Sequence, residues 1–382
     1  MKICMLTGAF PPDRCGVGDY VQRLCSHLAE LGAEVHVVTT AHSEPQPEGW
    51  DGAVRVHRIM RKWNSAGMCR LSRLIREIRP DVVHVQFPSV GYHRVAALAL
   101  LPLYLRASGR RAILTLHEYL ISSRLSRIRQ TMMAAASHAV ITVTPEDEAR
   151  LRLALPWKQQ SVHCISIASN IDRQPGESFD RTSCRKAWGM EPDAPVICFF
   201  GNLHPGKGVE ELIDAFAVLS RTCEDARLLL IGSFDPRHTL YSYVVHRKIL
   251  DLNLSGSVRV TGFVSRREVS ELLLSSDICV LPFREGVSVR RGTFLAAMRH
   301  SLPIITTQPD GAAPPELVDG GNVLLVGPQD TAGLARCMEM LVRSPELRSR
   351  LALNVAELDS RFSWPEIARR TLAVYDSALG SQ

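Results

Sequence analysis

The sequence predicts an α/β protein made of two doubly wound domains. Short apolar segments, typical of buried strands, alternate with amphipathic helical segments almost from end to end. This alternation indicates parallel sheets covered by helices on both faces. It is interrupted by a polar stretch with prolines and glycines at 173–194. The length of 382 residues also exceeds that of a typical single core, which favours two domains.

The first domain is expected to span residues 1–172. A helix at 19–31 has one apolar face and ends at Gly32, a residue that favours helix termination. Thr144 and Pro145, followed by three acidic residues, predict another helix start. The expected strands are KICMLT, EVHVVTT, VRVHRI, DVVHVQF, AILTLH, AVITVT and VHCISI.

The second domain is expected at 195–362, after an interdomain linker at 173–194. Its expected strands are PVICFFG, ARLLLIG, SVRVTG, DICVLPF, LPIITT and NVLLV. A terminal helix is expected within 363–382. Capping signals mark three helix starts, which are Asp235–Pro236, Ser265 with Glu268, and Ser363 with Glu366.

Composition restricts the compartment and the partners. Ten cysteines without a CxxC pair, several of them in strand-like segments, favour a reducing compartment over a disulfide or zinc role. The apolar stretches are too short to span a bilayer, and the chain starts directly in a strand. We therefore expect a cytoplasmic protein. The net charge of +6 suits an anionic ligand, whereas no basic run interleaved with aromatic residues suggests nucleic acid.

Cations stand at two helix starts of the second domain, each after a strand. Lys207 follows the glycine loop that begins at Gly201, and Arg290 and Arg291 precede Gly292 and Thr293. Helix starts carry a positive dipole, so cations there are unfavourable unless an anion binds among them. A diphosphate bound between the two starts would explain both. The alternatives are a solvated lysine, and an arginine paired with Glu285 or facing water.

The first domain offers weaker signals of the same kind. Gly16 and Gly18 precede the first helix, where they leave backbone N–H groups open to a ligand. His117 ends a strand, a position from which an imidazole can orient a hydroxyl or move a proton. A structural histidine is the alternative. Because parallel sheets bind ligands beyond the carboxyl ends of their strands, the interdomain cleft is the expected site.

In the order of its motifs, the chain resembles the family 4 glycosyltransferases, which have the GT-B fold. The resemblance rests on the N-terminal glycine loop, on the segments GNLHPGKGVEELIDAF, VRVTGFVSRREVSELLLSSDICVLPF, AAMRHSLPIITT and PPELVDGGNVLLV, and on the terminal FSWPEIARRTLAVY. It implies sugar transfer from a UDP- or GDP-sugar with retention of configuration, without a metal or another cofactor. It also implies that the terminal helix crosses back onto the first domain.

The resemblance assigns roles to individual residues. Lys207 would contact the diphosphate, and Gly16 would lie near the donor phosphates. His117 would touch the transferred sugar, and the turn carrying Phe263 and Val264 would lie near the base.

The chain departs from the family pattern in two respects. Asn202 stands where the family commonly has arginine. The two usual glutamates, separated by seven residues, cannot both be matched: one alignment gives Glu285 and Thr293, the other Ser288 and Ala296. We expect Glu285 to fill the first position, Arg290 or Arg291 to replace the missing charge, and Glu316 to be a candidate for the ribose.

The acceptor is expected to be a sugar, a glycan or a lipid-linked molecule. The basic segments 61–79 and 123–133 combine arginines with apolar residues, so peripheral adsorption to an anionic membrane is one interpretation. Ordinary core-facing helices with basic outer faces are the favoured one. A sugar-nucleotide epimerase and a non-catalytic partner of a transferase remain alternative functions.

Overall fold

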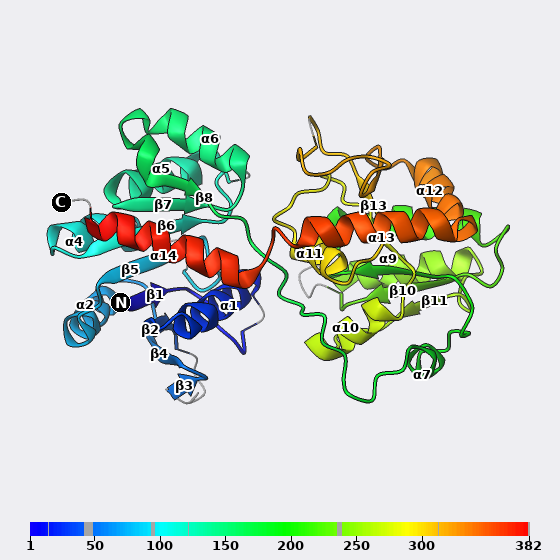
Figure 1. Ribbon diagram of the computed structural model, residues 1–382, viewed down its shortest axis with the longest axis horizontal. Coiled ribbons are helices and arrows are strands. Elements are labelled where there is room, and N and C mark those ends of the chain that lie inside the picture. The colour runs from blue at the N-terminus through cyan, green and yellow to red at the C-terminus, as the bar shows by residue number, and fades with distance from the viewer. Residues whose placement is uncertain are drawn as a thin grey trace. The chain divides into compact units, whose positions relative to one another are not determined.

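The computed structural model describes residues 1–13, 15–41, 49–92, 96–120, 122–234, 239–311 and 313–380. The chain divides into two compact α/β units (Figure 1). The first unit combines Met1–Asn170 with Ser363–Gln382, and the second is Ile171–Phe362.

The first unit is built on an eight-stranded sheet with the order β3-β4-β2-β1-β5-β6-β7-β8. Its strands pair in parallel except β3, which is antiparallel to β4 at one edge. The strands are β1 (Lys2–Leu6), β2 (Glu34–Thr40), β3 (Gly49–Asp51), β4 (Val54–Met60), β5 (Val82–Phe87), β6 (Arg111–Leu116), β7 (Ala139–Thr142) and β8 (Val162–Cys164). All seven predicted strands are present, and β3 is an addition.

Helices cover both faces of this sheet, each over its own apolar core. One core joins the sheet to α1 and the terminal helix α14, which is red in Figure 1. The other joins it to α2, α4, α5 and α6. The helices are α1 (Gly16–Glu30), α2 (Ser65–Ile78), α3 (Ala96–Ala99), α4 (Leu101–Ala107), α5 (Arg124–Ala136), α6 (Pro145–Ala154), the 3-10 helix η1 (Pro156–Ser161) and α14 (Trp364–Gly380).

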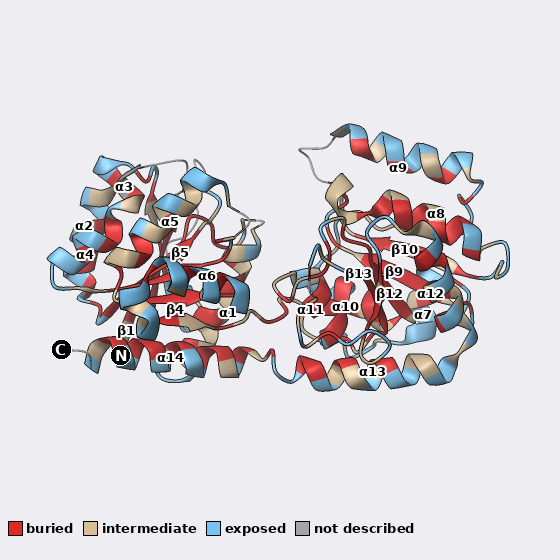
Figure 2. Cartoon of the chain, turned by 90° about the horizontal axis from the view of Figure 1, so that it is seen from above, coloured by how far each residue is buried: buried red, intermediate tan, exposed pale blue. Residues whose placement is uncertain are grey.

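The second unit has a six-stranded parallel sheet with the order β11-β10-β9-β12-β13-β14. The strands lie in the buried interior, and many of the helices turn an exposed face outward (Figure 2). The strands are β9 (Val196–Phe200), β10 (Arg227–Ile231), β11 (Val258–Val260), β12 (Ile278–Leu281), β13 (Ile304–Thr307) and β14 (Leu324–Val326). The helices are α7 (Arg181–Ala187), η2 (Pro205–Lys207), α8 (Val209–Leu219), α9 (Thr239–Asp251), α10 (Arg266–Leu274), α11 (Gly292–Arg299), α12 (Thr331–Arg343) and α13 (Pro345–Asp359).

The helix-start predictions meet different outcomes. The Thr144 side chain accepts from the Asp147 amide at the start of α6. Ser265 and Glu268 form the expected reciprocal capping box of α10. The first helix begins at Gly16, three residues before the predicted start. The cap predicted at Asp235–Pro236 lies outside the described residues.

The segment 173–194, predicted as a linker, belongs to the second unit and contains α7. Arg185 of α7 is almost fully buried; it pairs with Asp277 at 2.8 Å and donates to the Ser275 carbonyl at 2.9 Å. The polar segment that suggested an interdomain linker therefore contains a buried arginine with partners in the second unit. Within the part of the chain that the structure describes, no helix is long and apolar enough to cross a membrane.

Candidate active site

Two loops of the second unit pack directly on each other. The loop after β9 runs through η2 to Gly208, which has a φ of 68°, a conformation that favours glycine. A Cβ atom at Gly208 would also lie 1.9 Å from the Pro282 carbonyl oxygen. Pro282 follows β12 and leads into the arginine loop. Glycine at position 208 therefore brings the two predicted phosphate loops together.

The cations of these loops share one aromatic ring. Lys207 Nζ lies 5.1 Å from the centre of the Phe283 ring, and the Arg291 guanidinium carbon lies 4.3 Å from it. The ring is fully buried. Burial, helped by the charge of Arg291, lowers the pKa of Lys207 to about 8. Two cations held together and partly dehydrated indicate a site for an anion.

The neighbouring carboxylate of Glu285 offsets this charge only in part. Glu285 Oε2 lies 3.3 Å from Arg291 Nη2, and the carboxylate side chain is 80% exposed. The predicted alternative, an arginine paired with Glu285, is therefore also found. A pair with so exposed a carboxylate contributes little stabilisation. The positive charge of Lys207 is left for another anion to balance.

The start of α11 opens onto the same place. Among described residues no side chain caps this helix, so its first amides remain open. Thr293 Oγ1 is buried and has no hydrogen-bond partner in the described ranges. A Cβ atom at Gly201 would lie 3.2 Å from Thr293 Cγ2, which puts the two loops in contact here too. The start of α11 thus offers amides and a hydroxyl beside Arg291.

The start of α8 is occupied differently. Its first turn carries Glu210 and Glu211, and Arg284 pairs with them at 3.4 and 2.8 Å. These carboxylates already lie at the positive end of that helix. Lys207 therefore stands before a neutralised helix start, and α11 supplies the open one.

The remaining predicted donor residues lie apart from this cluster or contribute less to it. Arg290 is half-buried, and the described part of the chain gives its guanidinium no hydrogen bond or ion pair. Asn202 and Phe263 are exposed, and Val264 is half-buried. Glu316 is held through its backbone carbonyl, which accepts from Asn322 Nδ2 at 2.8 Å. The structure thus joins Gly201, Lys207, Arg291, Gly292 and Thr293, and it leaves Glu316 without a described contact to them.

His117 lies in the first unit, directly after β6. Its ring is buried, packs edge-on against Tyr20 at 5.0 Å, and places Nε2 at 2.9 Å from Gln86 Oε1. Burial lowers the pKa of His117 to about 4, so the imidazole is neutral near pH 7. Because an amide oxygen only accepts, the ring proton is on Nε2 and Nδ1 is the free acceptor.

A buried polar chain continues from this histidine to the terminal helix. Gln86 Nε2 lies 3.2 Å from His84 Nε2, and His84 Nδ1 lies 2.6 Å from the Tyr375 hydroxyl of α14. Sequence reasoning missed these three residues. One signal was present, because His84 and Gln86 interrupt an apolar strand at alternate positions and so face the same side of the sheet.

The two N-terminal glycines have different surroundings. A Cβ atom at Gly18 would lie 3.0 Å from the Ala9 carbonyl oxygen, whereas one at Gly16 would meet nothing within 4 Å. Within the described ranges, no side chain caps the start of α1. Gly18 is thus a packing residue, and Gly16 lies at an open helix start. Nowhere in the described ranges do three or more histidine, cysteine or acidic residues gather as metal ligands.

Proteins named as glycosyltransferases align with more than half, or nearly all, of this chain. An alpha-D-kanosaminyltransferase from Streptomyces kanamyceticus is 28% identical over 60% of this chain and 57% of its own length. The MMP alpha-(1->4)-mannosyltransferase of Mycolicibacterium hassiacum is 24% identical over 99% of this chain and 98% of that protein. Relatives of this kind do not favour an epimerase or a non-catalytic partner.

Two solved structures are similar in fold to this chain. HepE from Anabaena, crystallised with UDP and glucose, aligns over 99% of this chain and all of its own, with a TM-score of 0.76 and 19% identity. Sucrose-phosphate synthase from Thermosynechococcus elongatus aligns over the whole of both chains, with a TM-score of 0.78 and 18% identity.

Family descriptions match both units. "Glycosyltransferase Family 4" matches residues 15–173, and "Glycosyl transferases group 1" matches residues 194–344. Together they span most of the chain. The predicted resemblance is confirmed: the chain belongs to the family 4 glycosyltransferases, enzymes of the GT-B fold.

Proposed function

We propose that this enzyme transfers a sugar from a nucleotide-diphosphate sugar to a glycan, lipid-linked or small-molecule acceptor, with retention of configuration. One observation carries the proposal: Lys207 and Arg291 share the buried Phe283 ring beside the open start of α11. Helix starts with adjacent cations bind phosphate groups.

The donor base remains either uracil or guanine in this proposal. HepE was crystallised with UDP-glucose, and a Corynebacterium glutamicum relative, 22% identical, is named as GDP-mannose-dependent. Both donor types therefore occur among similar proteins. In this chain the backbone around Phe263 and Val264 would face the base.

The diphosphate is the leaving group, so its stabilisation is the main catalytic task. Lys207, Arg291, the α11 amides and the Thr293 hydroxyl would share its developing charge. These groups are cationic or hydrogen-bond donors, so the proposal includes no metal. As Arg291 turns to phosphate, Glu285 would be released toward hydroxyl groups of the donor sugar.

On the acceptor side, the neutral His117 would accept a hydrogen bond from a hydroxyl of the transferred sugar at Nδ1. Retention would follow from attack on the face that the diphosphate leaves, with a phosphate oxygen taking the acceptor proton. Gly16, at the open start of α1, would leave room for the donor phosphates. We also propose that the enzyme works in the cytoplasm, since cysteines such as Cys4, Cys198 and Cys279 are free thiols in the cores.

Thermal unfolding with nucleotides tests the donor site. UDP or GDP, without added metal, should raise the melting temperature, because a ligand at 100 times its Kd stabilises by about 2.7 kcal/mol. Lys207→Ala should reduce this shift, and the control Lys186→Ala, an exposed lysine of α7, should keep it. No shift with any nucleotide would contradict the donor site.

A screen of nucleotide sugars by mass spectrometry tests the reaction itself. We expect one donor to be consumed, by transfer or by slow hydrolysis, and consumption to be lost in Lys207→Ala. Nucleotide binding with no consumption of any donor, in the presence of sugar, glycan and lipid-linked acceptors, would contradict the proposed transfer.

A further inference from the structure

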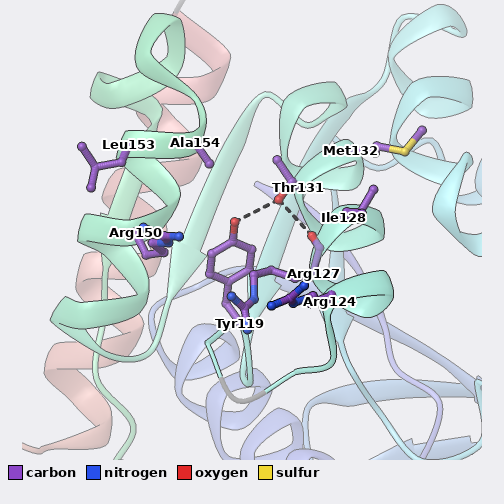
Figure 3. Close-up of a pocket in the computed structure, with 9 residues that line it drawn as sticks. All are labelled: Tyr119, Arg124, Arg127, Ile128, Thr131, Met132, Arg150, Leu153 and Ala154. Carbon is purple, nitrogen blue, oxygen red and sulfur yellow. Dashed lines mark hydrogen bonds between the residues drawn. The ribbon is translucent and has the colours of Figure 1, made fainter.

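A pocket of about 620 Å³ lies between α5 and α6 of the first unit (Figure 3). Tyr119, two residues beyond His117, forms part of its wall and is fixed by a 2.9 Å hydrogen bond between its hydroxyl and Thr131 Oγ1. The lining residues are Tyr119, Arg124, Arg127, Ile128, Thr131, Met132, Arg150, Leu153 and Ala154. No role proposed above for the reaction uses this pocket.

Three arginines from two helices reach this pocket. Arg124 and Arg127 come from α5, and Arg150 comes from α6 (Figure 3). Within the described residues none of the three has an ion pair. Arg152, two positions further along α6, is by contrast paired with Glu148 at 2.9 Å. The pocket thus concentrates unpaired positive charge.

Arg127 is held in place by neutral groups. Its Nη2 donates to the carbonyl oxygens of Leu120 and Ser122 at 3.0 and 3.1 Å. Its Nε is buried and has no partner in the described part of the chain. A fixed guanidinium without a carboxylate, next to two others, suits an anionic group with several acceptor oxygens, such as a phosphate.

Exposed apolar side chains are part of the pocket lining. Ile128 of α5 and Leu153 of α6 line the pocket and are 59% and 74% exposed. Leu125 of α5 and Trp157 of η1 add exposed apolar surface on adjoining parts of the chain, at 82% and 74%. Met132 is also exposed. A large exposed aromatic or aliphatic group is ordinary when single, but a cluster around a basic pocket indicates an interaction surface.

The other basic helix provides the contrast. In α2, Arg70, Arg73 and Arg76 are exposed, but Leu71 and Ile75 are buried in the core of the unit. The favoured interpretation of segment 61–79, a core-facing helix with a basic outer face, is therefore confirmed. In segment 123–133, which forms much of α5, apolar side chains instead remain exposed beside the arginines.

We propose that this pocket binds the phosphate headgroup of an anionic lipid, with the surrounding apolar side chains lying at the acyl boundary of a membrane. Unpaired charge and exposed apolar surface together fit an amphiphile, since each part of the site meets its complement. A soluble phosphate would leave the apolar side chains in water. Lipid binding of this kind is separate from donor binding and needs no nucleotide.

Co-sedimentation with vesicles tests the proposal on the full chain, without nucleotide. The protein should bind vesicles of phosphatidylglycerol and phosphatidylcholine and should bind pure phosphatidylcholine vesicles far less. Arg124→Ala with Arg150→Ala should weaken binding by about 30-fold, the effect of two basic contacts at an anionic surface. The matched control, Arg70→Ala with Arg73→Ala, removes the same charge from α2 and should weaken binding less than about twofold.

A second pair of variants tests the apolar part. Ile128→Ser with Leu153→Ser removes two exposed apolar side chains that line the pocket, so folding should be retained and vesicle binding should fall by about tenfold or more. Equal losses in the pocket pair and the α2 pair would show general charge attraction and would overturn the proposal. So would tight calorimetric binding of glycerol 3-phosphate with no vesicle binding, which would assign the pocket to a soluble ligand.

The nucleotide-induced melting shift keeps this test independent of the proposed reaction. Both arginine pairs should retain the shift seen with UDP or GDP. If the shift is retained and vesicle binding is absent, the lipid proposal fails while the donor site stands. If vesicle binding depends on the pocket while no nucleotide acts, the donor site fails and the lipid pocket stands.

Discussion

The Lys207–Arg291 cluster and the His117 network differ in how their buried polar groups are balanced. In the second unit, Lys207 and Arg291 remain cationic beside a buried ring, and in the described ranges their one ion pair joins Arg291 to the exposed Glu285. In the first unit, hydrogen bonds within the chain join His117, Gln86, His84 and Tyr375 into a neutral network, which leaves His117 Nδ1 as an acceptor for a sugar hydroxyl. The first arrangement needs an anion to balance its charge, whereas the second is held together by its own hydrogen bonds. Changes at the former should therefore affect binding, and changes at the latter should affect stability.

The largest effect is expected from Arg291→Ala. Removing one cation from a charge-stabilising site should lower the transfer rate by about 10²–10³-fold, measured as the initial rate of donor consumption. The melting temperature without ligand should change little, because the relieved repulsion with Lys207 offsets the lost hydrogen bond from Arg291 Nε to the Gly286 carbonyl. Arg221→Ala, an exposed arginine of the same unit, serves as control. A large drop in the ligand-free melting temperature would mean that Arg291 is structural.

The opposite pattern is expected for His84→Ala in the buried network. The change removes the ring that bonds the Thr115 hydroxyl, the Tyr375 hydroxyl and one side of the Gln86 amide, and unpaired buried groups cost about 1–3 kcal/mol each. We expect a loss of about 2–4 kcal/mol in the free energy of unfolding, measured by urea denaturation. Tyr375→Phe, which removes one hydroxyl, should cost about 1 kcal/mol. Unchanged stability in both variants would contradict a network that is held together by its own hydrogen bonds.

The pH dependence of nucleotide binding should separate the two sites further. The pKa of Lys207 is lowered to about 8 in the free protein, and a bound diphosphate should raise it. The lysine contribution to binding is therefore full below pH 8 and is lost as the pH rises above 8. We expect affinity to fall by up to about tenfold per pH unit there.

Lys207→Arg provides the matched variant, since an arginine keeps its charge throughout this range. Its affinity, measured by calorimetry, should stay flat between pH 7 and about 9.5. A wild-type profile that is equally flat would mean that Lys207 does not bind the diphosphate.

The smallest effects are expected at the two N-terminal glycines. Gly16→Ala should leave the melting temperature within about 2 °C of wild type, because its new methyl group meets open space, and a change of about 0.5 kcal/mol moves it no further. Gly18→Ala should lower stability by about 1 kcal/mol through its contact with Ala9. If Gly16 adjoins the donor phosphates, Gly16→Ala should weaken nucleotide binding severalfold; unchanged affinity would remove that role.

Local signals in the sequence were sufficient for most of the fold and for the charged half of the site. Strand runs, capping residues and glycine-loop-cation patterns each lie within about ten residues. Each pattern could therefore be recognised on its own, one giving Lys207 and the other Arg291 and Thr293, and the parallel-sheet prediction places both at the same edge of the sheet. The network could not be found in this way, because His84 and Tyr375 are 291 positions apart. Arg185 and Asp277 are similarly separated by 92 positions, which is why a packed segment resembled a linker. Only tertiary structure reveals such partners.

A crystal structure of the enzyme with UDP or GDP would show whether the Lys207–Arg291 cluster binds the diphosphate. We expect diphosphate oxygens within hydrogen-bond reach of Lys207 Nζ, the Arg291 guanidinium, Thr293 Oγ1 and the first amides of α11, with Arg291 turned away from Glu285. Phosphates bound elsewhere, with Lys207 and Arg291 still stacked on Phe283 and free of them, would contradict it.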